Sequence, residues 1–310
     1  MKCGLVILNY KDYKITRNLL EAVKDYPEIN HIAVIDNNSP NESYEVLKQY
    51  ESDKITVLKS DRNGGYSYGN NIGIRYLIKN FSPDIIAIAN PDVIFSNELV
   101  RRIKETFEAN PDYAVLTGFQ LNAKNNTGGH PFWQDNQTTA SSILKHMLYG
   151  LTISPFINLF RKVFRIRKAN SYREYLERIK NSPEALNQVY AVEGCLFFIR
   201  TKDFESVGLF DEKIFLFCEE DLLAGKIKAL GKKAGVLNDV TFIHAHKEHK
   251  NNNPFTFSLL ERGQIFYFCN YITESKTLHA VYITLKYLLK LKRLLKDSIK
   301  KLISHPENEA

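Results

Sequence analysis

Four polar clusters near the start of the chain carry side chains that could bind a charged ligand. Each follows a short apolar run; they are Asn9-Tyr10, Asp36-Asn37-Asn38-Ser39, Arg62-Asn63-Gly64-Gly65-Tyr66 and Asn90-Pro91-Asp92. The Asp36 carboxylate could accept hydrogen bonds from a base N–H or a ribose hydroxyl. Gly64 and Gly65 would let the backbone approach a ligand closely. Asp92 offers a hard oxygen, and Mg²⁺ typically takes one or two carboxylates together with substrate phosphates.

Each cluster alone also fits ordinary turn chemistry, because Asn, Asp and Gly are common loop residues. Asp92 could instead cap the following helix, although Ser96 or Asn97 is better suited to that role. The Gly64-Gly65 pair lacks the spacing of a dinucleotide-binding loop or a P-loop. A ligand site is favoured because all four clusters are expected at one edge of a sheet.

A run of acids, Glu219-Glu220-Asp221, opens a later helical pattern. A carboxylate there could act as a general base by taking a proton from a hydroxyl. At about 100° per residue, the packed face of this helix should consist of Leu223, Ile227 and Leu230. Glu219 and Glu220 fall within about 60° of that face, whereas Asp221 points away and is expected to be solvated.

Three histidines, His244, His246 and His249, follow the last strand pattern. Histidine is a common metal ligand, but this spacing is not that of a structural zinc site. Ordinary surface histidines therefore remain an alternative to a metal site.

The first 120 residues predict the elements that would position these side chains. Apolar runs alternate with amphipathic stretches, which is typical of βαβ units and a parallel sheet covered on both faces. The runs are Cys3–Leu8, His31–Ile35, Ile55–Leu58, Ile85–Ala89 and Tyr113–Thr117. The helical stretches are Thr16–Val23, Tyr44–Tyr50, Asn70–Ile78 and Glu98–Glu108. Ligands bind beyond the carboxyl ends of such strands, where the four polar clusters stand.

The alternation stops after residue 130. A strand pattern resumes at Val189–Ile199, a last strand is expected at Val240–His244, and Leu278–Leu302 predicts a long basic helix. We expect a catalytic domain over residues 1–250, with a helical insertion at about 130–188. A basic helical extension should occupy residues 251–310.

The ordered motifs resemble those of the inverting family 2 glycosyltransferases of the GT-A fold, and look closest to the bacterial rhamnosyltransferase-like branch. Besides the four clusters, the match continues through Gly69-Asn70-Asn71-Ile72-Gly73, Glu193-Gly194-Cys195, Val207-Gly208-Leu209-Phe210-Asp211-Glu212 and Glu219-Glu220-Asp221. It covers about residues 3–120 and 189–250. The resemblance implies an α/β fold with a mostly parallel, Rossmann-like sheet flanked by helices.

The resemblance also implies a nucleotide-sugar donor, Mg²⁺ or Mn²⁺ on its diphosphate, and single displacement at the anomeric carbon. Asp36 matches the nucleoside-binding Asp, and Asp92 matches the metal ligand. Glu220 matches the base, with Glu219 as its neighbour or substitute. His246-Lys247-Glu248 resembles the family's His-x-Glu, which favours His246 over His244 as the metal-binding histidine. The implied donor-binding residues are Asn9, Asp36, Asn63, Gly64, Gly65, Asn70 and Asn90.

The expected function is transfer of a sugar from dTDP-rhamnose or a UDP-sugar to a lipid-linked or cell-surface polysaccharide acceptor. A sugar-1-phosphate nucleotidyltransferase is an alternative, but it should have a Gly-rich basic loop where Asn9-Tyr10-Lys11-Asp12 stands. A non-catalytic membrane-surface protein is another, and it would not need Asp92 or the Glu219-Glu220 pair.

The charge is unevenly distributed along the 310 residues, whose net value is +7. Residues 145–180 carry nine Lys or Arg and two Glu, a net charge of +7, and residues 278–302 carry seven Lys or Arg and one Asp, a net charge of +6. The rest of the chain therefore has a net charge of −6. Leu285, Leu288, Leu289, Leu295 and Ile299 form an apolar stripe on the basic helix, which favours an anionic membrane surface over packing on the catalytic domain. No nucleic-acid-binding signature is present.

The location of the protein can be predicted from two further features. The apolar run at the N-terminus is too short for a signal peptide. Four cysteines without Cys-x-x-Cys spacing favour a reducing compartment over a disulfide scaffold. We therefore expect a cytoplasmic protein, peripheral on the cytoplasmic face of the membrane, with no nucleic acid partner.

Overall fold

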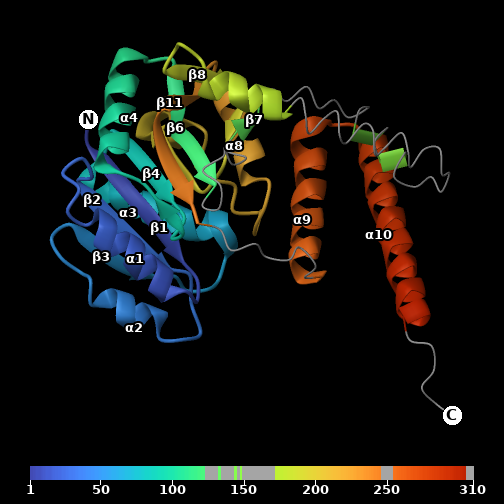
Figure 1. The fold of residues 1–310 in the computed structure, drawn as a ribbon. Helices are drawn as coiled ribbons and strands as arrows, with labels where there is room; N and C mark the ends of the chain where they lie inside the picture. The colour runs from blue at the N-terminus through green and yellow to red at the C-terminus, as the bar shows by residue number, and fades with distance from the viewer. Residues whose placement is uncertain (123–131, 134–142, 145–146, 149–171, 246–253, 305–310) are drawn as a thin grey trace. The chain divides into compact units, whose positions relative to one another are not determined.

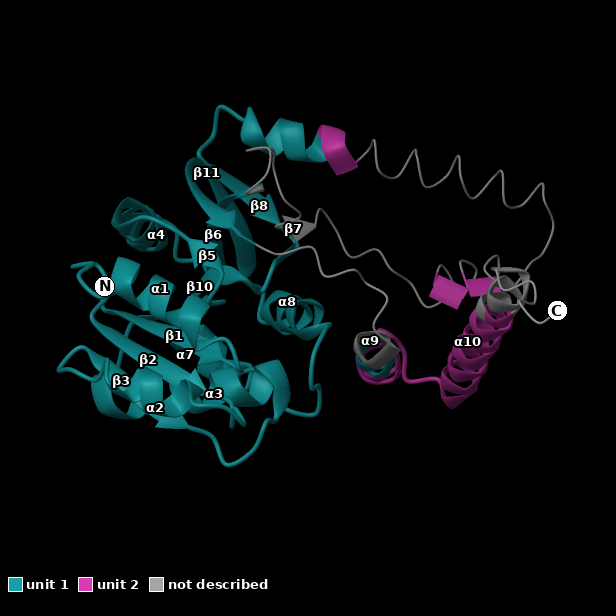
Figure 2. Cartoon of the chain, turned by 60° about the horizontal axis from the view of Figure 1, so that its bottom comes forward, with its two compact units in different colours: residues 1–136, 175–263 teal, residues 137–174, 264–310 magenta. Residues whose placement is uncertain are grey.

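The computed structural model describes residues 1–122, 132–133, 143–144, 147–148, 172–245 and 254–304 (Figure 1). The chain divides into two compact units, residues 1–136 with 175–263 and residues 137–174 with 264–310 (Figure 2). The domain boundaries expected from the sequence stay predictions. Residues 172–180 are helical, whereas most of the expected insertion lies outside the described residues.

The first unit is built on a mixed sheet whose first four strands are parallel. In spatial order these are β3 (Ile55–Lys59), β2 (His31–Asp36), β1 (Cys3–Asn9) and β4 (Ile85–Ala89). The sheet continues with β10 (Leu196–Arg200), β6 (Tyr113–Asn122), β11 (Lys233–His244) and β5 (Val93–Ile94). Of these, β10 is antiparallel to both neighbours, and β11 is parallel to β6. The α/β fold class with a mostly parallel sheet is confirmed.

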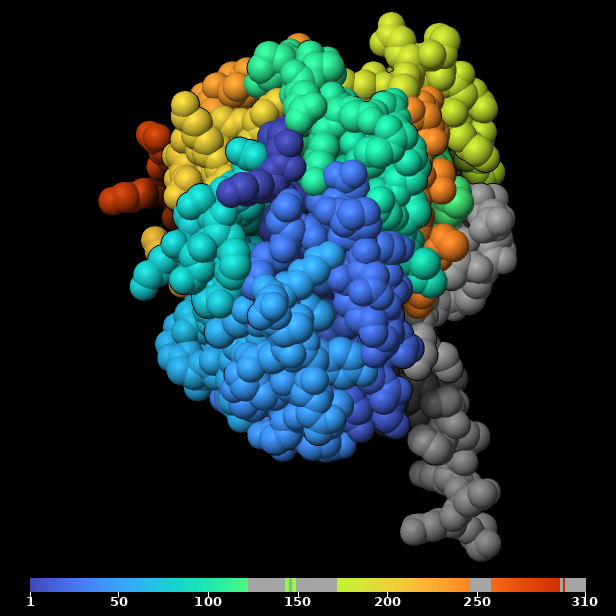
Figure 3. Space-filling model, turned by 90° about the vertical axis from the view of Figure 1, so that its left-hand side faces the viewer, coloured from blue at the N-terminus to red at the C-terminus, as the bar shows by residue number. Residues whose placement is uncertain are grey.

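Helices cover both faces of this sheet. On one face α1 (Tyr13–Val23), α2 (Ser43–Lys48) and α4 (Asn97–Ala109) share a core with Leu5 and Ile7 of β1. Figure 3 shows the surface of the N-terminal part of this unit, coloured blue to green. On the other face lies α3 (Gly65–Phe81), where a Cβ on Gly73 would stand 2.8 Å from Val6. Because both faces are covered, these strands are mainly apolar, and β2 and β4 are buried along their whole length.

The strand expected at Val189–Ile199 is three strands in the structure: β8 (Leu186–Val189), β9 (Ala191–Val192) and β10. The break at Tyr190 has little signal in the sequence because apolar residues flank it, whereas Glu193 and Gly194 mark the second break. Strand β8 pairs with β11, and β9 pairs with β7 (Phe132–Trp133) in a separate two-stranded sheet. The second break brings Glu193, Gly194 and Cys195 to the edge of the main sheet.

The second unit has a small core of its own. The long helix α10 (Lys276–Ser304) contains the predicted basic helix, and the π-helix η1 (Phe268–Ile272) precedes it. Helix α9 (Pro254–Tyr267) lies within residues 251–310, which were expected to be helical, and only its residues from 264 on belong to this unit. Phe268 and Tyr282 stack with ring centroids 3.9 Å apart, beside Met147 and Leu285. Among the described residues, no helix combines the length and the apolar character needed to cross a membrane.

Candidate active site

Asn9 and Asp36 form a buried polar network at the carboxyl ends of β1 and β2, where they are paired in register. Asn9 Nδ2 donates a hydrogen bond to Asp36 Oδ1 at 2.8 Å, and the Ser39 amide donates to Asp36 Oδ2 at 2.9 Å. Asn9 Oδ1 accepts from the Thr16 hydroxyl at 2.8 Å. Both side chains therefore brace the loops at this edge. Direct contact of Asn9 or Asp36 with a nucleoside stays a prediction.

Asn63, Gly64 and Gly65 lie where β3 leads into α3. Asn37 Nδ2 donates to Asn63 Oδ1 at 3.0 Å and to the Gly65 carbonyl at 3.1 Å. Gly65 has a φ of +85°, and a Cβ there would stand 2.0 Å from the Phe215 carbonyl oxygen. A Cβ on Gly64 would meet the Tyr68 ring at 2.2 Å. Both glycines thus permit close contacts within the chain, and their approach to a ligand stays a prediction.

The remaining predicted donor-binding residues, Asn70 and Asn90, lie on different elements. Asn70 is buried in α3, and its Nδ2 donates to the Tyr66 carbonyl at 3.0 Å. Its Oδ1 has no hydrogen-bond partner within the described part of the chain. Asn90 is half-buried after β4, and its amide donates to the Cys195 carbonyl at 2.7 Å. This bond fixes the end of β4 to the segment before β10.

Two aromatic residues near these loops were not selected from the sequence. Tyr10 directly follows β1 with 43% of its surface exposed, and Lys11 Nζ lies 4.9 Å from its ring centroid. Tyr68 carries the Arg62 guanidinium 4.5 Å from its ring centroid. An exposed aromatic ring and a cation suit a nucleobase and a phosphate. Tyr10 could have been found because it is the aromatic residue directly after the first apolar run, at the sheet edge where a ligand is expected.

The acids expected to include the base occupy the first turn of α8 (Glu219–Ala229). Phe217 and Cys218 precede them with φ values of +75° and +72°, a left-handed conformation that non-glycine residues rarely adopt. Such backbone strain is often found at functional sites. Glu219 is buried, whereas Glu220 is half-buried.

Glu220 is joined to the segment before β10 through Gly194. The Gly194 amide donates to Glu220 Oε1 at 3.0 Å, and the Tyr66 hydroxyl donates to the Gly194 carbonyl at 2.6 Å. The Gly194 residue is therefore held on both sides, by α8 and by the start of α3. A Cβ on Gly194 would stand 2.7 Å from Glu220 Oε1, so the carboxylate sits against bare backbone.

Burial controls the protonation of this acidic pair. It raises the pKa of Glu219 to about 8, and the neighbouring charge of Glu220 adds to the rise. Burial likewise raises the pKa of Glu220, which lies beside Tyr190, Phe197 and Leu223 around a small apolar cavity. A helix N-terminus favours ionised carboxylates, so desolvation outweighs the helix dipole here.

The packed face of α8 differs from the expected one. It consists of Glu219, Leu222, Leu223, Ala224 and Ile227, whereas Leu230 follows the helix and is 42% exposed. The helix ends there because Gly231 adopts a φ of +70° and the last turn closes on it. Asp221 is half-buried rather than fully solvated.

Asp92, which was predicted to bind the metal, lies beside His244. His244 Nε2 is 3.2 Å from Asp92 Oδ1, and the Ala245 amide donates to the Asp92 carbonyl at 2.8 Å. His246 and His249 lie outside the described residues, so the preference for His246 stays a prediction. In the described structure, His244 is the histidine that stands next to Asp92.

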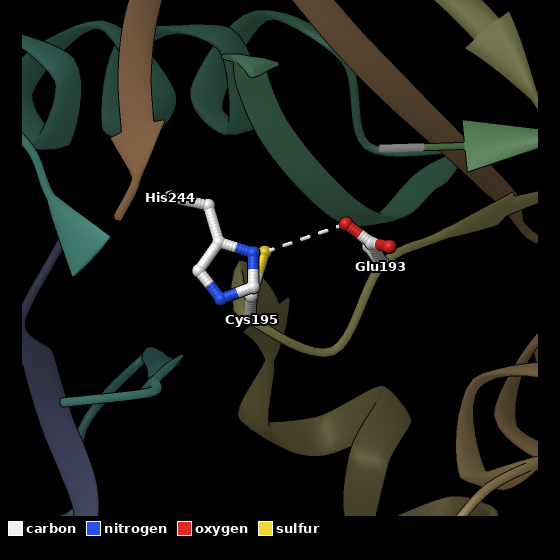
Figure 4. Close-up of side chains that lie close together, drawn as sticks. All are labelled: Glu193, Cys195 and His244. Carbon is white, nitrogen blue, oxygen red and sulfur yellow. Dashed lines mark hydrogen bonds between the residues drawn. The ribbon is translucent and has the colours of Figure 1, made fainter. Parts of the chain in front are cut away.

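Glu193 and Cys195 complete this group from the segment before β10. Glu193, Cys195 and His244 each offer a potential ligand atom, all within 4.8 Å of one another (Figure 4). The Cys195 thiol points at Glu193 Oε2, at 3.8 Å, and at Gln120 Oε1, at 3.6 Å. Burial raises the pKa of Glu193 to about 7, although nearby His244 lowers it. Because β10 runs antiparallel to β4, its amino end meets the carboxyl end of β4.

The residues present fit a divalent cation. Asp92 and Glu193 each lie near His244 and offer carboxylate oxygens, which suit Mg²⁺ and Mn²⁺, and His244 offers an imidazole nitrogen. Cys195 is a weaker candidate, because burial raises the pKa of its thiol and only the thiolate binds metals well.

Comparison with known proteins shows the family to which the chain belongs. The model for glycosyl transferase family 2 matches residues 5–189, which is more than half of the chain. The chain belongs to glycosyl transferase family 2. This family 2 chain is 26% identical over 218 residues to the low-salt glycan biosynthesis hexosyltransferase Agl10 of Haloferax volcanii. The match spans 70% of the chain but only 58% of that relative.

Solved structures agree on the fold. The mannosyltransferase PcManGT from Pyrobaculum calidifontis, in complex with GDP-Man and Mn²⁺, matches with a TM-score of 0.57 and 13% identity, over 93% of this chain and 72% of that one. S. aureus TarS 1-349 with UDP-GlcNAc matches with a TM-score of 0.53 and 15% identity, over 87% and 67%. At these identities the likeness establishes the fold alone, which is the GT-A fold.

Proposed function

We propose that this family 2 chain is an inverting glycosyltransferase that uses a nucleotide-diphosphate sugar. The observation that carries the proposal is the link through residues 193–195. Gly194 binds the Glu220 carboxylate, while Cys195 binds Asn90, two residues before Asp92. A candidate base and a candidate metal site are thereby joined at one sheet edge, as a single displacement requires.

In the proposed reaction an acceptor hydroxyl oxygen attacks the anomeric carbon of the donor. Glu220 takes the hydroxyl proton as the new bond forms. The bond from the anomeric carbon to the phosphate oxygen breaks, and its electron pair leaves with the nucleoside diphosphate. Attack opposite the leaving group inverts the anomeric configuration. A divalent cation held by Asp92 and His244 would supply positive charge to the diphosphate.

Glu220 is preferred to Glu219 as the base because of access. Glu219 is only 5% exposed, and its Oε2 has no hydrogen-bond partner among the described residues. With its pKa raised to about 8, it holds a proton at neutral pH. Glu220 is half-buried, and the Gly194 amide fixes its orientation. We assign Glu219 to the support of the first turn of α8.

The donor and acceptor follow from the resemblance and the relatives. PcManGT binds GDP-Man and TarS binds UDP-GlcNAc, which supports a nucleotide sugar here, with dTDP-rhamnose or a UDP-sugar as our candidates. The name of Agl10 refers to glycan biosynthesis. We place the acceptor, a lipid-linked or surface polysaccharide, at the cytoplasmic face of an anionic membrane.

A donor-hydrolysis screen tests the proposal. Purified chain is incubated with a panel of nucleotide sugars and Mg²⁺ or Mn²⁺, and release of nucleoside diphosphate is measured. Once the donor and acceptor are identified, Glu220→Gln should lower transfer by about 10²–10⁴-fold and leave nucleotide binding unchanged. The control is Glu45→Gln on α2, whose side chain is exposed. Failure to consume any nucleotide sugar would count against the function, and full transfer by Glu220→Gln against the base.

A further inference from the structure

Helix α10 exposes a concentration of large apolar side chains. Six of its residues have more than 40% of their surface exposed: Val281, Tyr287, Leu288, Leu291, Leu294 and Leu295. Scattered exposed leucines are normal on soluble proteins, but a contiguous group commonly marks an interaction surface. These six residues are referred to below as the outer face of α10.

The outer face is distinct from the side of α10 that packs inside its own unit. The packing side, called the inner face, consists of Leu278, Tyr282, Leu285 and Leu289. At about 100° per residue, the inner face spans about 60° and the outer face about 140°, with centres roughly 140° apart. The single apolar stripe expected from the sequence therefore divides in two. Leu285 and Leu289 belong to the inner face, whereas Leu288 and Leu295 belong to the outer one.

Basic side chains border the outer face. By the same helical spacing, Lys292 falls about 20° beyond one edge and Lys290 about 40° beyond the other, whereas Lys286 and Arg293 lie nearer the inner face. Residues 278–302 hold seven Lys or Arg and one Asp. A second copy of this helix would bring like charges together, which disfavours self-association through this face. An anionic surface with an apolar interior complements both the charge and the leucines.

We propose that the outer face of α10 docks on an anionic lipid bilayer, with the helix lying in the plane of the interface. The leucines enter the boundary between headgroups and acyl chains, and Tyr287 sits at headgroup level. The basic side chains extend their apolar stems along the surface and bring their charges to the lipid phosphates. This proposal rests on the proposed function in one respect, which is that the acceptor is located at the membrane.

Vesicle co-sedimentation of the full chain, without donor or acceptor, tests the proposal. The vesicles contain phosphatidylcholine and phosphatidylglycerol in equal parts, or phosphatidylcholine alone. We expect binding to the anionic vesicles that weakens at about 1 M salt, where charges more than about 3 Å apart are screened. The double variant Leu288→Asp with Leu291→Asp should bind at least about tenfold more weakly.

The matched control is Leu230→Asp, the same exchange at an exposed leucine outside α10. It should bind vesicles like the unchanged chain, and circular dichroism should show that all variants are folded. Equal binding to both vesicle types, or unchanged binding by the double variant, would overturn the proposal. The proposal would also be overturned if the unchanged chain formed a dimer in sedimentation velocity and did not bind vesicles, and if the double variant abolished that dimer. Donor hydrolysis in the same preparations reports separately on the proposed function.

Discussion

His244 Nε2 lies 3.2 Å from Asp92 Oδ1, and this pair joins the end of β11 to the loop after β4. The backbone fixes the approach, because His244 pairs with Val93 in the β5–β11 ladder and the Ala245 amide donates to the Asp92 carbonyl. An imidazole and a carboxylate held this way can bind the same cation.

His244→Ala should therefore lower the affinity for Mn²⁺ by about 10-fold or more, since one of few protein ligands is removed. Calorimetric titration of Mn²⁺ in the presence of a nucleoside diphosphate measures this. His279→Ala serves as the control, because His279 lies on α10 and bonds the Thr273 carbonyl there. If His244→Ala retained Mn²⁺ affinity and His246→Ala lost it, the metal-binding histidine would be His246, as predicted from the sequence.

The contact between Gly194 and Glu220 predicts a second outcome. Gly194→Ala would place a methyl group 2.7 Å from Glu220 Oε1 and displace the carboxylate. We expect kcat to fall by about 10–100-fold with little change in donor KM, because misplacement of a catalytic group mainly affects the chemical step. Steady-state kinetics with donor and acceptor separates the two constants.

The matched control is Gly225→Ala in α8, the helix that carries Glu220. A Cβ there would meet only the Tyr190 hydroxyl, at the ordinary contact distance of 3.7 Å. Alanine also favours the helix by about 0.5–1 kcal/mol relative to glycine, so this variant should be active and at least as stable. If both exchanges lower kcat equally, the Gly194 contact does not position the base.

Glu219 predicts how stability depends on pH. Its pKa is about 8 in the folded chain, against an ordinary value of 4.5. Between these values the unfolded chain has released the proton that the folded chain still binds, so stability falls as pH rises from about 5 to 8. Glu219→Gln cannot ionise and should show a smaller fall in its thermal unfolding midpoint over this window. Glu45→Gln should follow the unchanged chain, and identical slopes for all three would show that Glu219 is not buried in its acid form.

The parallel half of the sheet was predictable because its strands are buried on both faces. The register of Asn9 with Asp36 follows from two apolar runs that end in polar residues at the same level. The sequence did not reveal that these side chains bond each other. Burial of a polar group depends on how the neighbouring loops and helices pack over it, as Thr16 of α1 and the Ser39 loop do here, and that packing is not written in the strand pattern.

The second half of the site was less predictable. Glu193 lies at the sheet edge because β10 runs antiparallel to β4, and strand direction leaves no trace in an apolar run. On α10, Leu285 is buried and Leu288 is exposed, although both fit one broad apolar stripe. Which part of such a stripe is covered depends on a tertiary partner, here Phe268 and Met147.

Glu193 carries the last prediction, which concerns the pH dependence of transfer. Burial raises its pKa to about 7, and the charge of Glu220 contributes to that rise. Coulomb repulsion is mutual, so an ionised Glu193 makes ionisation of Glu220 harder. Glu193→Gln removes this repulsion, and the acid limb of the kcat/KM profile should move to lower pH. The profile is measured between about pH 5 and 9, which brackets the raised carboxyl pKa values. Cys195→Ser, which keeps the carboxylate, should leave the limb in place. An unmoved limb in Glu193→Gln would mean that Glu193 does not act on the base.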